Sequence, residues 1–90
     1  MIYLIYGETG EYGDHTEWDY GYTTSEQKAQ EMTQFLNSKL LELGLQGKYI
    51  ADLWEKQREN RQLFEDTYDS NFRLDYTGSY YRYRSIAEIE

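Results

Sequence analysis

The densest group of side chains that could do chemistry lies between residues 8 and 19. It joins carboxylates to two aromatic rings, and its members are Glu8, Glu11, Tyr12, Asp14, Glu17, Trp18 and Asp19. Carboxylate oxygens are ligands that calcium prefers, but an EF-hand loop needs them at fixed positions around an invariant glycine. Counting from Glu8 or from Glu11 does not reproduce that register. A cation site built on this tract would therefore be irregular.

The sequence lacks the residues that most catalytic and metal sites require. His15 is the single histidine and cysteine is absent, which excludes a histidine-pair zinc site and a thiol nucleophile. A serine triad would have to use His15, and no Gly-x-Ser-x-Gly elbow accompanies it. The glycines at 7, 10 and 13 lack the lysine of a phosphate-binding loop. We expect a protein that is not an enzyme and has no cofactor or metal ion, with His15 an exposed loop residue.

The tract is better suited to binding another protein. Tyrosine and tryptophan offer large contact areas with few rotatable bonds, so Tyr12 and Trp18 could anchor an interface. The alternative is that Trp18 packs in the core. Residues 1–22 carry no lysine or arginine, and the net charge is -8. Such a surface repels nucleic acid and anionic membranes and favours basic partners, although residues 8–19 could mimic a short stretch of duplex phosphates.

Composition limits the chain to one small domain, residues 1–90. The absence of cysteine fits a reducing, cytoplasmic setting. The N-terminal residues do not resemble a signal peptide, and no apolar stretch approaches the roughly 20 residues that span a bilayer. Valine is absent and there are 11 tyrosines, so we expect tyrosines to supply much of the core. A small core also favours a homodimer, which would bury more apolar area per chain.

Hydrophobic periodicity predicts a hairpin at the start of the chain. Residues 2–6 are apolar on both faces, as in a central strand. Residues 17–22 alternate, which places Trp18, Tyr20 and Tyr22 on one face. These two segments are expected to pair as antiparallel strands.

Two helices and two further strands are expected to follow. A capping box at Thr23 or Thr24 begins a helix over 24–43, and Gly44 is placed to end it. Its predicted buried stripe is Ala29, Met32, Leu36, Leu40 and Leu43. A second helix spans about 48–67 and has a polar centre. Alternation then predicts strands over 72–76 and 80–89, with a bulge near Ser85, unless Ser85 caps a last helical turn. The fold class is α+β, a small antiparallel sheet with two helices in the order β-β-α-α-β-β.

Both ends of the chain bring a family to mind. The residues concerned are Tyr3-Leu4-Ile5-Tyr6-Gly7-Glu8, Gly10-Glu11-Tyr12-Gly13-Asp14, Tyr22 to Ala29 and Tyr81 to Ile89. They resemble small uncharacterised proteins of phages and mobile elements that have a Gly-Glu-Tyr hairpin turn before a helix and a tyrosine-rich last strand. The small, acidic, cysteine-free composition is also similar to that of anti-CRISPR inhibitors.

The acidic aromatic tract over 8–19, which contains no lysine or arginine, leads us to expect a phage-type, anti-CRISPR-like inhibitor in the cytoplasm of a host cell. It would dock through the acidic aromatic tract on a basic nucleic-acid-handling host protein, of which a CRISPR effector is one example. One alternative is a small-ligand or cation-binding accessory protein that uses the 8–19 loop. Another is a structural homo-oligomer.

Overall fold

A computed structural model describes residues 1–10, 15–46, 54–74 and 78–86 of the chain. Within them lie strands β1 (Ile2–Thr9) and β2 (Thr16–Thr23), helices α1 (Glu26–Glu42) and α2 (Trp54–Thr67), and strand β3 (Ser79–Ile86). The predicted α+β class with two helices is confirmed. Among the described residues, no helix is long and apolar enough to cross a lipid bilayer.

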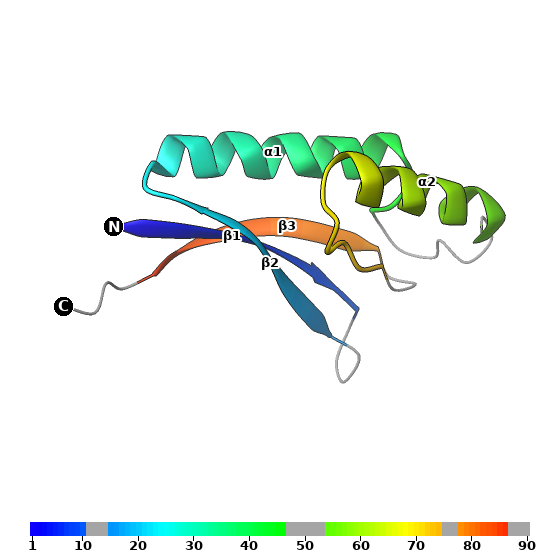
Figure 1. The fold of residues 1–90 in the computed structure, drawn as a ribbon, viewed down its shortest axis with the longest axis horizontal. Coiled ribbons are helices and arrows are strands. Elements are labelled where there is room, and N and C mark those ends of the chain that lie inside the picture. Colours follow the sequence, from blue (N-terminus) through cyan, green and yellow to red (C-terminus); the bar gives the residue numbers. More distant parts are fainter. Residues whose placement is uncertain (11–14, 47–53, 75–77, 87–90) are drawn as a thin grey trace.

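The three strands form one antiparallel sheet in the order β2-β1-β3. β1 is therefore the central strand, as its apolar residues on both faces predicted. Figure 1 shows α1 lying along one face of this sheet, with α2 near the C-terminal end of α1 on the same side. Among the described residues, no helix or strand covers the opposite face. We call this opposite side the open face.

A bulge in β2 changes which residues share a face. Ile5 pairs with Gly21 and Tyr6 with Asp19, so Tyr20 between them has no partner on β1. The inserted residue reverses the alternation on one side of it. Trp18 consequently faces α1 and is buried, whereas Tyr22 belongs to the open face and is 63% exposed. The prediction that Trp18, Tyr20 and Tyr22 share one face was wrong for this reason.

The bulge predicted near Ser85 does not form. The pairing of β3 with β1 runs without a shift from Ile2 and Ile86 to Thr9 and Ser79. Ile86 does face away from Tyr81 and Tyr83, but no bulge is needed, because the open face also carries apolar residues. Residues 87–90 lie outside the described part of the chain.

α1 begins later than the capping-box pattern suggested. Ser25 is the N-cap, and its hydroxyl oxygen accepts a hydrogen bond from the backbone N–H of Lys28 at 3.3 Å. The Thr23 hydroxyl accepts instead from the Ser25 N–H at 3.2 Å. The Ser25 side chain thus satisfies one of the free N–H groups of the first turn, as expected of an N-cap.

The C-terminus of α1 is a Schellman turn, as the glycine predicted. Gly44 adopts a left-handed φ of 70°. Its N–H donates to Leu41 O at 3.2 Å, and the Leu45 N–H donates to Leu40 O at 2.9 Å. This 6→1 and 5→2 pair is the hydrogen-bond pattern of the motif. It directs Leu45 back into the core, where it is fully buried.

The core lies between α1, the sheet and the segment after α2. Its fully buried members from the predicted stripe are Ala29, Leu36 and Leu40, while Met32 stays 37% exposed. Aromatic residues complete it, as expected, and these are Trp18, Phe64, Phe72 and Tyr81 with Tyr3, Tyr20, Tyr68 and Tyr83 at its margin.

The strand predicted over 72–76 does not form at residues 72–74. Phe72 turns inward there, with its ring centroid 4.5 Å from that of Phe64 and 5.8 Å from that of Trp18. Phe72 and Leu74 both pack on the core, as the alternation suggested, but residues 72–74 do not pair with the sheet. Residues 75–77 lie outside the described part, as do residues 48–53 of the predicted second helix, which is seen over 54–67.

Candidate functional site

The predicted docking residues are divided between the surface and the core. Glu8 is the penultimate residue of β1 and pairs with Glu17 on β2, while Asp19 pairs with Tyr6, and all three belong to the open face. Glu17 and Asp19 are exposed and Glu8 is half-buried. The other members of the tract before β2, Glu11, Tyr12 and Asp14, lie outside the described residues.

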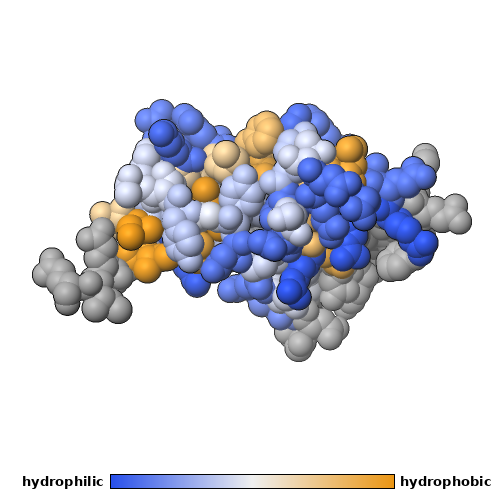
Figure 2. Space-filling view, viewed as in Figure 1, coloured by the Kyte–Doolittle hydropathy of each residue, from blue (hydrophilic) through white to orange (hydrophobic). Residues whose placement is uncertain are grey.

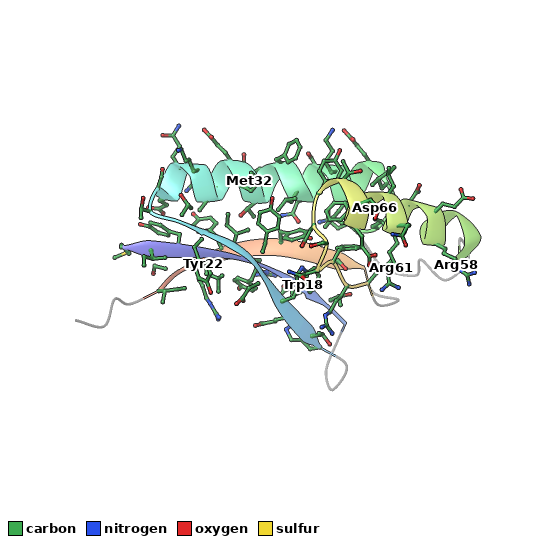
Figure 3. The ribbon with its side chains drawn as sticks, in the orientation of Figure 1. Trp18, Tyr22, Met32, Arg58, Arg61 and Asp66 are labelled. Atoms are coloured by element: carbon green, nitrogen blue, oxygen red, sulfur yellow. The ribbon has the colours of Figure 1, made fainter. Side chains whose placement is uncertain are left out.

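Trp18 is a core residue and is not exposed for docking. It is 7% exposed, and its ring lies over Gly7 on the neighbouring strand. Its indole Nε1–H donates to Asp69 Oδ2 at 2.8 Å. A buried indole needs a partner for that N–H, and Figure 3 shows Trp18 on β2 below α2. Of the two interpretations of Trp18, packing in the core is the one the structure shows.

Asp69 is the residue that sequence reasoning missed. Its carboxylate is buried and accepts three hydrogen bonds, from Trp18, from the Tyr81 hydroxyl at 2.6 Å and from the Asn71 N–H at 3.0 Å. Burial, followed by this hydrogen bond to Asp69, raises the pKa of the Tyr81 phenol above its ordinary value. The phenol therefore stays protonated and remains a donor. The only signal in the sequence was indirect, since a core tryptophan and tyrosine each need a polar partner.

His15 lies close to two glutamates at the turn end of the hairpin, where β1 ends and β2 begins. Its Nε2 lies 3.3 Å from Glu17 Oε1 and 3.8 Å from Glu8 Oε2. The three potential ligand atoms all lie within 4.8 Å of one another. One imidazole nitrogen and two carboxylates are ligands that zinc accepts. Arg82 Nε competes for this site, because it donates to Glu8 Oε1 at 2.6 Å.

The open face separates charges by strand. Acidic side chains come from β2 and arginines come from β3, while β1 between them is mostly apolar. Arg84 lies over the ring of Tyr6, with its Cζ 5.0 Å from the ring centroid. From β2 through β1 to β3, successive rows are Tyr22, Leu4 and Arg84, then Asp19, Tyr6 and Arg82, then Glu17, Glu8 and Tyr80. The first 22 residues contain no lysine or arginine, but β3 places Arg82 and Arg84 beside them in space.

An open depression lies next to this face. It has a volume of about 450 Å³ and is lined by Trp18, Asp19, Ser70, Asn71, Phe72 and Arg73. Polar atoms make up most of its wall. Ligand pockets are usually enclosed and mostly apolar, so this shape favours water over a small organic ligand.

In comparisons with known proteins, no family model, no curated protein and no solved structure matched the chain.

Proposed function

We propose that this protein is a non-catalytic binding module that docks through its β1–β2 hairpin on a basic surface of a nucleic-acid-handling protein. The observation that carries the proposal is the acidic end of the hairpin, where Glu17 and Asp19 are exposed on β2. The connecting tract adds Glu11 and Asp14 in sequence. Trp18 has no part in the docking surface, because it is buried.

The net charge of -8 supports the same partner class. A surface of this sign attracts proteins whose own surface binds phosphates, and it accelerates their encounter. The resemblance of both chain ends to phage proteins makes an inhibitor of a host enzyme, such as a CRISPR effector, the specific form of the proposal. Such an inhibitor acts by occupying the groove that nucleic acid would enter.

Reversing the charge of the hairpin is expected to slow the docking. The triple variant Glu11→Lys, Asp14→Lys and Glu17→Lys should lower the association rate constant about tenfold or more at low salt, with a flatter salt dependence. The partner is first captured from cell lysate at low and high salt and identified by mass spectrometry. Association with the purified partner is then measured by surface plasmon resonance.

A control variant separates the hairpin from total charge. Glu31→Lys, Glu59→Lys and Asp66→Lys make the same change in net charge at exposed positions of the two helices. We expect this variant to bind nearly as fast as the wild type. Equal rates for the hairpin variant and the wild type would refute docking through the hairpin.

The cluster of Glu8, His15 and Glu17 supports a second candidate function, the binding of a divalent cation. If the cluster binds zinc, excess Zn²⁺ should raise the melting temperature, since a ligand at about 100 times its Kd stabilises by about 2.7 kcal/mol. In a domain of this size each 1 kcal/mol corresponds to about 4–8 °C. His15→Ala should abolish the shift and Glu31→Ala should preserve it, as followed by calorimetry. A zinc-induced shift that survives His15→Ala would argue against this site.

A further inference from the structure

The open face has a pattern of charge that complements itself. Asp19 on β2 and Arg82 on β3 flank Tyr6 in one row, and in the next row Tyr22 and Arg84 flank Leu4. The face is therefore acidic or aromatic along one edge and basic along the other, with an apolar centre. A surface of this kind can pair with a rotated copy of itself.

The arrangement of the charges determines which rotation is allowed. A two-fold axis that runs parallel to β1, between two stacked sheets, places β2 of one copy over β3 of the other. Asp19 then faces Arg82 of the second copy, and Tyr22 faces Arg84. An axis across the strands would instead place β2 over β2 and β3 over β3, which sets like charges opposite each other.

The apolar centre supplies the contact area on this axis. Tyr6, which is half-buried, lies at the middle of the face and would meet the same residue of the second copy, while Leu4 beside it is only 3% exposed. Figure 2 shows a hydrophobic patch at the end of the sheet where β1 begins and β3 ends. Ile2 and Ile86 form the cross-strand pair there. Tyr22 and Tyr80, which are 63% and 41% exposed, add aromatic surface on either side, and exposed apolar surface often marks an interaction site.

Hydrogen bonds along the β3 edge of the sheet disfavour the pairing of a further strand with that edge. The Asn37 side chain bonds both backbone groups of Tyr81, accepting from its N–H at 2.8 Å and donating to its O at 2.9 Å. The Ser79 N–H donates to Leu45 O at 3.0 Å. These contacts occupy backbone groups of β3 that an added strand would need.

We propose that two copies of this chain associate through their open faces about a two-fold axis parallel to β1, with β2 of each over β3 of the other. Strands of eight residues, at about 3.3 Å per residue and about 4.8 Å apart, give a face about 26 Å long and about 14 Å wide. That is small for a specific interface, so the dimer is weak and concentration-dependent.

The sign of a charge placed at position 22 tests the arrangement. Tyr22→Lys puts a cation opposite Arg84 of the second copy and is expected to raise the dimer dissociation constant about tenfold or more. Tyr22→Glu puts an anion there and is expected to leave it unchanged or lower it. Leu41→Lys, at a residue of α1 that is 67% exposed, is the matched control and is expected to change nothing. Because Tyr22 and Leu41 are both exposed, neither substitution should impair folding.

Sedimentation equilibrium over a wide range of protein concentration measures these constants against a chain mass of 10.9 kDa. A wild type that stays monomeric at millimolar concentration overturns the proposal and leaves the open face to a different partner. If Tyr22→Lys and Leu41→Lys raise the dimer dissociation constant equally, the interface does not lie on the open face. Equal weakening by Tyr22→Lys and Tyr22→Glu rules out β2 over β3.

Discussion

Gly7→Ala is expected to destabilise the fold by about 3 kcal/mol, at the upper end of what overpacking a core costs. A Cβ at Gly7 would overlap the Cζ2 and Cε2 atoms of the Trp18 ring. The ring cannot move aside easily, because Asp69 holds its Nε1–H and Phe72 packs against it edge to face. The free energy of unfolding, measured with urea, should fall while the m-value stays constant.

Gly21→Ala is the matched control for this loss. Gly21 lies on the same hairpin, and a Cβ built there meets nothing within 4 Å. Alanine there should be neutral or slightly stabilising, since glycine weakens a strand by roughly 0.5–1 kcal/mol. If both alanine variants lost the same free energy, backbone effects rather than the packing of Trp18 on Gly7 would explain the result.

Asp69→Ala alone is expected to lower the free energy of unfolding by about 3 kcal/mol. The substitution leaves the Trp18 N–H and the Tyr81 hydroxyl without their acceptor, and each unsatisfied buried group costs about 1–3 kcal/mol. Thermal unfolding followed by circular dichroism should show a much lower melting temperature.

Two further variants resolve the cause of that loss. Asp69→Asn keeps one acceptor oxygen for the Trp18 N–H and the Tyr81 hydroxyl, so its free energy of unfolding should fall less than that of Asp69→Ala. The new amide group then faces the Asn71 N–H, so some loss remains. Asp66→Ala removes an exposed carboxylate that accepts a bond from Gln62 on the same helix, and should cost less than 1 kcal/mol. A full loss in Asp66→Ala would mean that helix charge, and not the buried network, is responsible.

The elements that follow from local pattern were predictable, and those that depend on distant contacts were not. β1 was predicted to be the central strand because its own residues are apolar on both faces. Gly44 correctly predicted the C-terminus of α1. The bulge at Tyr20 could not be predicted, because apolar and polar residues alternate without interruption through this part of the sequence. Phe72 appeared in an alternating run, and only the contact with Phe64 and Trp18 draws it inward.

The candidate site shows the same division. Exposure of Glu17 and Asp19 followed from their polarity and their place in an alternating strand. The pairing of Glu8 with Arg82 joins residues at opposite ends of the chain, and only the position of β3 beside β1 brings it about. The burial of Asp69 likewise depends on the turn after α2, and in the sequence this turn looks like an ordinary polar segment.

The strand order also governs when the chain can fold. β1 lies in the middle of the sheet, yet its partner β3 includes residues as distant as Ile86, which pairs with Ile2. Until β3 has been synthesised, β1 is an edge strand with unpaired backbone groups, and the core lacks the ring of Tyr81. Contacts of such long sequence separation slow folding, because loop-closure entropy is lost before they form. The native sheet is therefore completed only after synthesis has passed β3, and the nascent hairpin spends that interval with an open edge.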